Sequence, residues 1–241
     1  MTFFNRHNIS QSFLTAKNGL KSLFFPNLCE ICGGEMSAGE NHICHYCLSH
    51  LNYTLFENYT TDTPVHEVFY GRVNITFAFS LVYFKKNTAI QDLLHQIKYN
   101  HGHELAVKMG EDIAIKLQKN THFLTVDALV PIPLHRKKEA IRGYNQSLKI
   151  AEGVCKTSHC SIIHLLSRTK HHESQTKKDR FGRWENVENI FQVEHDQVPP
   201  KHIALVDDVI TTGSTLEAAA RVIRKSYPSI QISIITIAFA Q

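Results

Sequence analysis

One segment near the end of the chain constrains its fold more than any other, the run Ile203-Ala-Leu-Val-Asp207-Asp208-Val-Ile-Thr211-Thr212-Gly213-Ser214-Thr215. It begins as an apolar strand that ends in two adjacent carboxylates, continues as a hydroxyl-rich turn and leads into a helix. Ligands of open α/β sheets bind at the carboxyl ends of strands, where this order places its polar groups. The segment therefore predicts an α/β sheet with a ligand site at this strand end.

The turn and the two carboxylates suit different parts of one ligand. Backbone N–H groups at a helix start favour a phosphate, and the hydroxyls of 211–215 add donors. Asp207 and Asp208 repel a phosphate but suit neutral hydroxyls, so together the groups predict a ribose 5-phosphate site. A capping box between Ser214 and Glu217 is the alternative without a ligand. It leaves the paired aspartates unexplained, and the ligand site fails if both acids turn inward to basic neighbours with no hollow beside them.

Strand and helix patterns alternate from about residue 75 to the end, which is typical of an α/β domain with a mainly parallel sheet. We predict a small module at 28–60 and the α/β domain at 65–241, preceded by an amphipathic segment at 1–27. The expected strands are a pair within 65–84, then 128–133, 162–163, one around Phe191, 202–206 and 230–239. The expected helices are 87–97, 104–119, one that follows a basic loop and ends near Cys155, and 216–225.

Four of the six cysteines define the small module, as Cys29-Glu-Ile-Cys32 and Cys44-His-Tyr-Cys47 with eleven residues between the pairs. Two such turns can complete a tetrahedron of thiolates, so we predict a structural Zn²⁺ site. About 30 residues have too little core to fold alone, and zinc contributes about 10–16 kcal/mol in small peptides. Disulfides and a redox CxxC are the weaker alternatives. His42 and His45 could substitute for one thiolate, but we expect them to be bystanders. Cys155 and Cys160 have no partner at this spacing and are expected to be ordinary thiols.

Composition excludes few functions. Apolar residues make up 43% of the 241-residue chain and charged residues 20%, as in globular proteins. The net charge of +4 does not require a nucleic-acid partner. No run approaches the roughly 18 apolar residues that span a bilayer, and the N-terminus lacks the apolar core of a secretory signal. We therefore expect a cytoplasmic location and no stable membrane insertion.

With these features in place, the chain resembles a known family. The 207–215 segment is similar to the phosphoribosyl pyrophosphate (PRPP) motif of type I phosphoribosyltransferases. Preceded by the four cysteines, the chain resembles the ComF family, competence-associated phosphoribosyltransferase-like proteins that include GntX. The similarity runs from about residue 28 onward through further segments: Ile97-Lys98-Tyr99, 130–134 with Arg136, 142–146, Arg168-Thr169, Gln175, Arg180, Asn186 and Phe191.

The resemblance implies roles for individual residues. Asp207 and Asp208 would hold the ribose hydroxyls as tentative positioning groups of catalysis. The remaining PRPP contacts would come from Val209, Thr211, Thr212, Gly213, Ser214 and Thr215. Pyrophosphate would meet the basic loop through Arg136, Lys137 and Arg142, since arginine grips phosphate with two parallel hydrogen bonds. A basic lid over 167–183 would contribute Arg168, Gln175, Lys178 and Arg180. Contact of that lid with single-stranded DNA is the rival interpretation.

Two functional hypotheses follow. The first is a glycosyltransferase, a phosphoribosyltransferase that uses PRPP with Mg²⁺ and mainly positions reactants and stabilises leaving charge. The second is a non-catalytic accessory protein of DNA uptake that binds PRPP or a nucleotide and acts through the zinc module and basic loop. A base-salvage enzyme ranks third, because such enzymes usually lack the cysteine module. Single-stranded DNA and competence proteins are the expected partners; the acceptor and the oligomeric state stay open.

Overall fold

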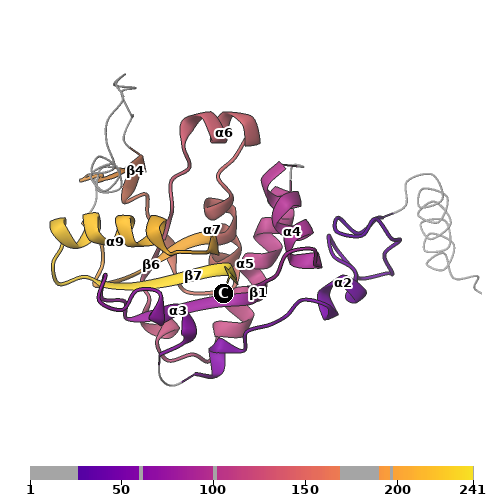
Figure 1. Ribbon diagram of the computed structural model, residues 1–241, viewed down its shortest axis with the longest axis horizontal. Coiled ribbons are helices and arrows are strands. Elements are labelled where there is room, and N and C mark those ends of the chain that lie inside the picture. Colours follow the sequence, from indigo (N-terminus) through magenta and orange to yellow (C-terminus); the bar gives the residue numbers. More distant parts are fainter. Residues whose placement is uncertain (1–26, 60–61, 100–101, 169–189, 196–197, 241) are drawn as a thin grey trace, which may run out of the picture. The chain divides into compact units, whose positions relative to one another are not determined.

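The computed structural model describes residues 27–59, 62–99, 102–168, 190–195 and 198–240 (Figure 1). The chain divides into two compact units, Met1–His50 and Leu51–Gln241, which are described separately. Nearly all of the predicted amphipathic segment 1–27 lies outside the described residues. The predicted limits of the module and of the α/β domain stay predictions.

The first unit is organised around its cysteines. A short antiparallel bridge joins Leu28 to Glu35, and helix α2 (His45–Ser49) follows the second cysteine pair. Gly33 has a φ of 68°, the left-handed conformation that the turn after the first pair requires. Cys44 is the N-cap of α2, and its sulfur accepts a hydrogen bond from the backbone of Cys47. Local backbone geometry thus holds each pair as a knuckle.

A parallel sheet forms the centre of the second unit. Among the described residues its five strands run in the order β1 (Phe77–Phe84), β7 (Gln231–Ala240), β6 (His202–Ile210), β2 (Ala128–Pro131) and β3 (Ser161–Ile162). All four pairings are parallel, and β6 and β7 are buried over most of their length. The predicted α/β class with a mainly parallel sheet is confirmed. Strands β4 (Leu166–Arg168) and β5 (Phe191–Val193) form a separate antiparallel pair.

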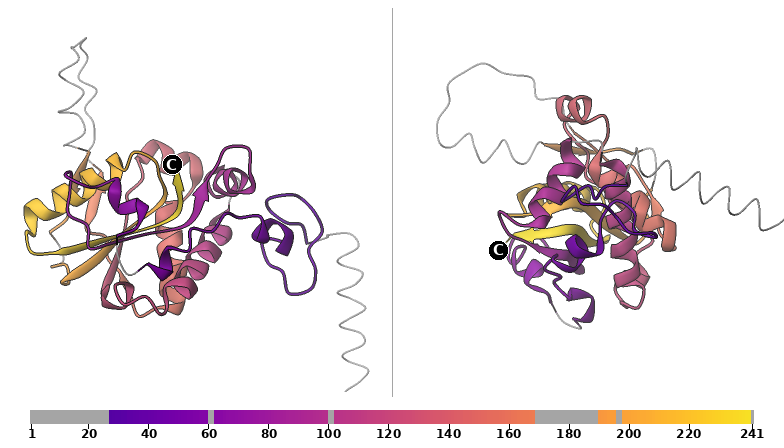
Figure 2. Two further views of the ribbon diagram at one scale, coloured as in Figure 1. Left: turned by 60° about the horizontal axis from the view of Figure 1, so that its bottom comes forward. Right: turned by 90° about the vertical axis from the view of Figure 1, so that its right-hand side faces the viewer.

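Helices cover both faces of this sheet (Figure 2). The described helices are α3 (Pro64–Glu67), α4 (Ala89–Tyr99), α5 (His103–Leu117), α6 (Arg136–Arg142), α7 (Gln146–Thr157) and α9 (Ser214–Ser226), with 3-10 turns at Phe56–Asn58 and Phe123–Thr125. The connection from β2 to β3 leads toward the β3 edge of the sheet, whereas the connection from β6 to β7 leads toward the β1 edge. Right-handed crossovers therefore place α7 and α9 on opposite faces. No helix among the described residues is long and apolar enough to cross a bilayer.

Three sequence predictions were wrong in detail. The expected strand pair within 65–84 is one helix, α3, and one strand, β1. Pro64 occupies the first helical turn, and the Thr63 and His66 side chains close a capping box, so the apolar run after Pro64 starts as a helix. The strand predicted to end at the carboxylates continues to Ile210, because β7 pairs with it that far. The expected basic loop contains helix α6, capped by His135.

Candidate functional site

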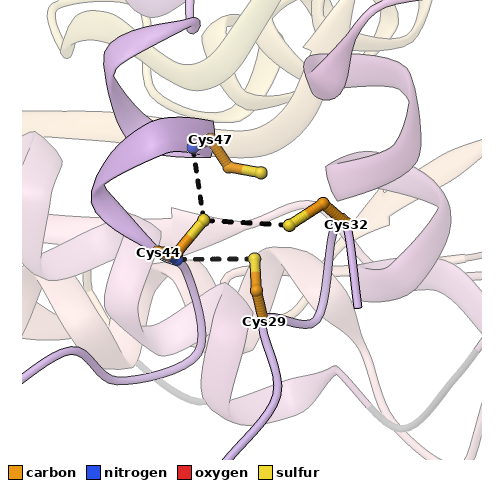
Figure 3. Close-up of side chains that lie close together, drawn as sticks. All are labelled: Cys29, Cys32, Cys44 and Cys47. Atoms are coloured by element: carbon orange, nitrogen blue, oxygen red, sulfur yellow. Dashed lines mark hydrogen bonds between the residues drawn. The ribbon is translucent and has the colours of Figure 1, made fainter. Parts of the chain in front are cut away.

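The four cysteine sulfurs converge on one point (Figure 3). They all lie within 4.8 Å of one another. The Sγ atoms of Cys32 and Cys44 are 3.8 Å apart, which is far longer than a disulfide bond. A tetrahedral zinc ion with Zn–S bonds of about 2.3 Å sets its sulfurs about 3.8 Å apart. The spacing therefore fits a four-thiolate zinc site.

The pKa values of the four thiols are also consistent with a bound cation. Burial acts to raise the pKa of Cys29, but hydrogen bonds from the backbone of Cys32, Cys44 and Ile31 outweigh it and lower the pKa to about 6. Burial, followed by the neighbouring sulfurs, raises the pKa of Cys47. Four thiolates cannot share this volume without a positive charge, and a bound metal supplies one. His42 pairs with Glu30 at 2.6 Å.

The two aspartates of β6 have different surroundings. Asp208 is buried, and its Oδ2 forms a 2.9 Å ion pair with Nζ of Lys98 at the end of α4. Asp207 is less buried, and its Oδ1 accepts hydrogen bonds of 2.9 Å from the Ser147 hydroxyl and from the backbone N–H of Asp208. Burial, and next the charge of Asp208, raises the pKa of Asp207 to about 7. One acid is thus neutralised by a lysine, while the other can hold a proton near neutral pH.

The turn after β6 carries exposed hydroxyls and an uncapped helix start. Thr211, Thr212 and Ser214 are exposed, and α9 begins at Ser214 with Gly213 as N-cap. No side chain caps α9, and Glu217 pairs instead with Arg72 and Arg221. The capping box that was the alternative to a ligand is therefore absent. Because the first N–H groups of a helix have no intrahelical acceptors, this turn offers donors to an anion.

Gly213 allows the turn its shape. Its φ is 72°, and a Cβ there would lie 2.6 Å from Cγ1 of Val68 and 3.0 Å from Cε1 of Phe69. Arg72, from the same segment as Val68 and Phe69, donates a 2.8 Å hydrogen bond to the carbonyl oxygen of Thr212, the residue before Gly213. The segment 68–72 therefore forms the back wall of the turn.

The predicted pyrophosphate residues lie on α6, which follows β2. None of its seven residues is buried, and Arg136, Lys137 and Arg142 all belong to it. Arg142 donates a 2.8 Å hydrogen bond to Gln146 and lies over the ring of Tyr99. The Tyr144 hydroxyl in turn donates to the carbonyl oxygen of Ile97. These contacts connect the base of α6 with the end of α4, next to Lys98.

One of the predicted lid residues is described. Arg168, at the end of β4, lies over the ring of Phe191. Burial lowers the pKa of Arg168, and the Asp207 carboxylate opposes that shift, so the two side chains are close enough to interact. Gln175, Lys178 and Arg180 lie outside the described residues.

Sequence reasoning assigned no role to three residues that shape this site. Lys98 stood in one of the family-like segments, but nothing in the sequence linked it to Asp208 110 positions away. Ser147 follows the predicted Arg142–Gln146 segment and gave no signal of its own. Arg72 falls within the strand pair expected at 65–84 and was given no role. Each of these contacts joins residues that are distant in sequence. Only knowledge of which helix ends lie beside which strand ends could have suggested them.

The chain is similar to several competence and DNA-utilization proteins. Competence protein F of Haemophilus influenzae is 33% identical over 117 residues, 47% of this chain and 51% of that protein. Competence protein ComFC of Bacillus subtilis is 30% identical over 154 residues, 63% of this chain and 60% of that protein. DNA utilization protein YhgH of Escherichia coli is 28% identical over 148 residues, 59% of this chain and 65% of that protein. The chain is thus similar, over part of its length, to proteins named for competence and DNA utilization.

The similarity to Competence protein F and ComFC supports the resemblance to the ComF family seen in the motifs. No protein-family model matches the chain. The similarity to these ComF relatives spans between about half and two thirds of their own length. The roles of individual residues in the acid pair, the turn, α6 and the lid stay predictions.

Proposed function

We propose that this chain is a phosphoribosyltransferase-like protein that binds PRPP, or a related ribose 5-phosphate, together with Mg²⁺. The observation that carries the proposal is the uncapped start of α9 directly after the acid pair of β6. Phosphate would bind the N–H groups and hydroxyls of 211–215. The ribose hydroxyls would donate to Asp207 and Asp208. Two kinds of group, one for each end of a sugar phosphate, thus follow one another along a single strand and turn.

Binding of the sugar requires an exchange at the acid pair. Asp208 faces inward to a basic neighbour, Lys98. If Asp207 did the same and left no hollow beside it, the pair could not hold a sugar. Asp207 retains partial exposure, and its carboxylate lies near the half-buried Arg168. We expect ribose hydroxyls to reach Asp207 first and then to replace Lys98 on Asp208. The freed ammonium would remain beside the ligand as a positive charge.

The chemistry that these residues support is positioning. The acid pair would fix the ribose ring, and the basic residues of α6 and Arg168 would stabilise charge that develops on a leaving pyrophosphate. Carboxylates are the oxygen donors that Mg²⁺ prefers, and the ion would supply charge neutralisation between ribose and pyrophosphate oxygens. None of the described groups needs to act as a covalent nucleophile.

The names of the relatives support a link of the proposed activity to DNA uptake. They refer to competence and DNA utilization and name no transferase reaction. That wording favours the second candidate, an accessory protein that binds PRPP or a nucleotide without turnover. In that case the zinc module and the basic residues would contact single-stranded DNA or competence proteins.

An acceptor screen separates the two candidates. PRPP with Mg²⁺ is incubated with the protein and with nucleobases, amines or single-stranded DNA, and pyrophosphate release is measured. The enzyme predicts release that Asp208→Asn abolishes and that Asp92→Asn, an exposed acid of α4, leaves unchanged. Calorimetric binding of PRPP with no product from any acceptor supports the accessory protein. Absence of PRPP binding to the folded wild type contradicts both.

A further inference from the structure

Residues 144–147 lead from α6 into the first turn of α7. They overlap the family-like segment 142–146, of which only Arg142 has a role in the proposed function. Gly143 is the C-cap of α6 with a φ of 79°, and α7 begins at Gln146. All four side chains of 144–147 form hydrogen bonds with residues outside this stretch. The stretch is therefore held by its surroundings along its whole length.

Two side chains anchor the stretch to other elements of the second unit. The Tyr144 hydroxyl donates to the carbonyl oxygen of Ile97 on α4, the residue before Lys98. The Asn145 amide donates a 3.0 Å hydrogen bond to the carbonyl oxygen of Ile132, which follows the end of β2. Strand β2 pairs in parallel with β6, the strand of the acid pair. The stretch is thus fixed relative to both the helix and the sheet that carry the charged groups of the site.

The hydroxyl of Ser147 is not used to cap α7. Serine is common at the start of a helix because its oxygen can accept from a free backbone N–H group. Here Asn145 is the N-cap, and its side-chain oxygen accepts a 2.9 Å hydrogen bond from the backbone N–H of Ser147. The Ser147 side chain is instead directed at another element. Its hydroxyl is buried and donates a 2.9 Å hydrogen bond to Oδ1 of Asp207.

The donors around Asp207 meet at one of its two oxygens. Oδ1 accepts from the Ser147 hydroxyl and from the backbone N–H of Asp208, both at 2.9 Å. Within the part of the chain that the structure describes, every hydrogen bond to this carboxylate is made at Oδ1. Two donors on one oxygen fix the rotation of the carboxylate. Because Asp207 is only partly buried, Oδ2 is then the oxygen that can accept from a ligand.

We infer that Ser147 is a positioning residue of the sugar-phosphate site, which holds Asp207 by Oδ1 so that Oδ2 accepts from a ribose hydroxyl. The inference rests on the proposed function, because it requires a sugar at the acid pair. Ser147 acts on the acid, whereas phosphate would be bound by the turn 211–215. Loss of the Ser147 hydroxyl should therefore weaken the hold on the ribose and leave the hold on the phosphate unchanged. A serine that only supported the fold would affect both.

The test titrates ribose 5-phosphate, and separately inorganic phosphate, into the full chain and follows the backbone amide resonances of 211–215. Ser147→Ala should weaken binding of ribose 5-phosphate by about tenfold, as expected for a hydrogen bond to a charged group, with phosphate binding unchanged. Ser226→Ala, at an exposed serine of α9, should alter neither.

Two further comparisons isolate the hydroxyl. Threonine keeps the donor and valine has the same shape without it, so Ser147→Thr should bind ribose 5-phosphate more tightly than Ser147→Val. In the Asp207→Ala background, Ser147→Ala should cause no further loss, because the acid that it positions is already absent.

Equal binding of ribose 5-phosphate by wild type and Ser147→Ala would overturn the positioning role and leave the proposed function intact. So would equal binding by the threonine and valine variants, or a further loss when Ser147→Ala is added to Asp207→Ala. Parallel losses of ribose 5-phosphate and phosphate binding would show that Ser147 only supports the fold, which also overturns the role. If the folded wild type does not bind ribose 5-phosphate, the proposed function is contradicted and the positioning role with it.

Discussion

Asp207 shows how burial changes the chemistry of a single residue at this site. Its pKa of about 7 in the folded chain, raised first by burial and then by Asp208, compares with an ordinary value of 3.8. The folded state therefore binds a proton more tightly than the unfolded state does. The sign is then fixed: the contribution of Asp207 to stability falls as pH rises from about 4 to about 7.

Asp207→Asn removes this titration. We expect the free energy of unfolding of the variant, relative to that of wild type, to be higher at pH 8 than at pH 5. The reason is that the wild-type side chain is ionised in the folded state only at the higher pH. Urea denaturation at both pH values measures the difference, with Asp92→Asn as the exposed control. An equal difference between Asp207→Asn and wild type at pH 5 and pH 8 would contradict the raised pKa.

The ion pair of Lys98 with Asp208 provides a second prediction at this scale. The side chains are 22% and 6% exposed, so Lys98→Met would leave a buried carboxylate without its partner. We expect a loss of about 3 kcal/mol in the free energy of unfolding. Asp208→Asn in the Lys98→Met background should restore most of it, and Lys86→Met, an exposed lysine, should change little. Additive effects of the two substitutions would show that the pair is not coupled.

Helices α5 and α7 pack with their backbones close together at two glycines. A Cβ on Gly110 would lie 2.1 Å from the carbonyl oxygen of Ile150, and one on Gly153 would lie 2.0 Å from that of Val107. These atoms belong to backbone that cannot turn aside. Glycine at both positions is what lets the two helices pack together.

We therefore expect Gly110→Ala to lower the free energy of unfolding by about 3 kcal/mol, despite the better helix propensity of alanine. Ile115→Ala, at an exposed position of the same helix, should cost much less. Thermal and urea denaturation of the two variants give the comparison. A neutral or stabilising Gly110→Ala would mean that the helices can separate without penalty.

Sequence periodicity predicted most elements of the second unit, because α4, α5 and β7 have clear apolar patterns of helical or strand spacing. It failed at 65–76, where a proline and a capping box outweigh the β-forming residues of a short run. It also ended β6 too early, since pairing with β7, rather than the side chains of Asp207 and Asp208, decides how far that strand extends.

For the whole molecule, the motifs predicted which residues lie close together in sequence, but not the contacts that other elements make with them. The cysteine spacing indicated a common cluster, and the four sulfurs do converge. The acid pair and turn are adjacent in sequence and could be found together. Lys98, Ser147 and Arg72 reach them only through folding.

Zinc should be bound by the first unit alone. We expect about one zinc per chain by metal analysis, with Cys32→Ser reducing that content and Cys155→Ser, a cysteine of α7, leaving it unchanged. Chelation should move the amide resonances of 27–50 into the narrow range of shifts that is typical of unfolded chains, while the resonances of the sheet stay where they are. A folded, zinc-free first unit would contradict the metal assignment.

The sugar-phosphate site is tested most directly by titrating ribose 5-phosphate into the ¹⁵N-labelled chain and following each backbone amide. The proposal predicts that the largest shifts fall on Gly213, Ser214 and Thr215. It also predicts that Asp207→Asn weakens binding while the largest shifts stay on the same three residues. Shifts confined to other parts of the chain, or saturable binding that ignores the acid pair, would contradict it.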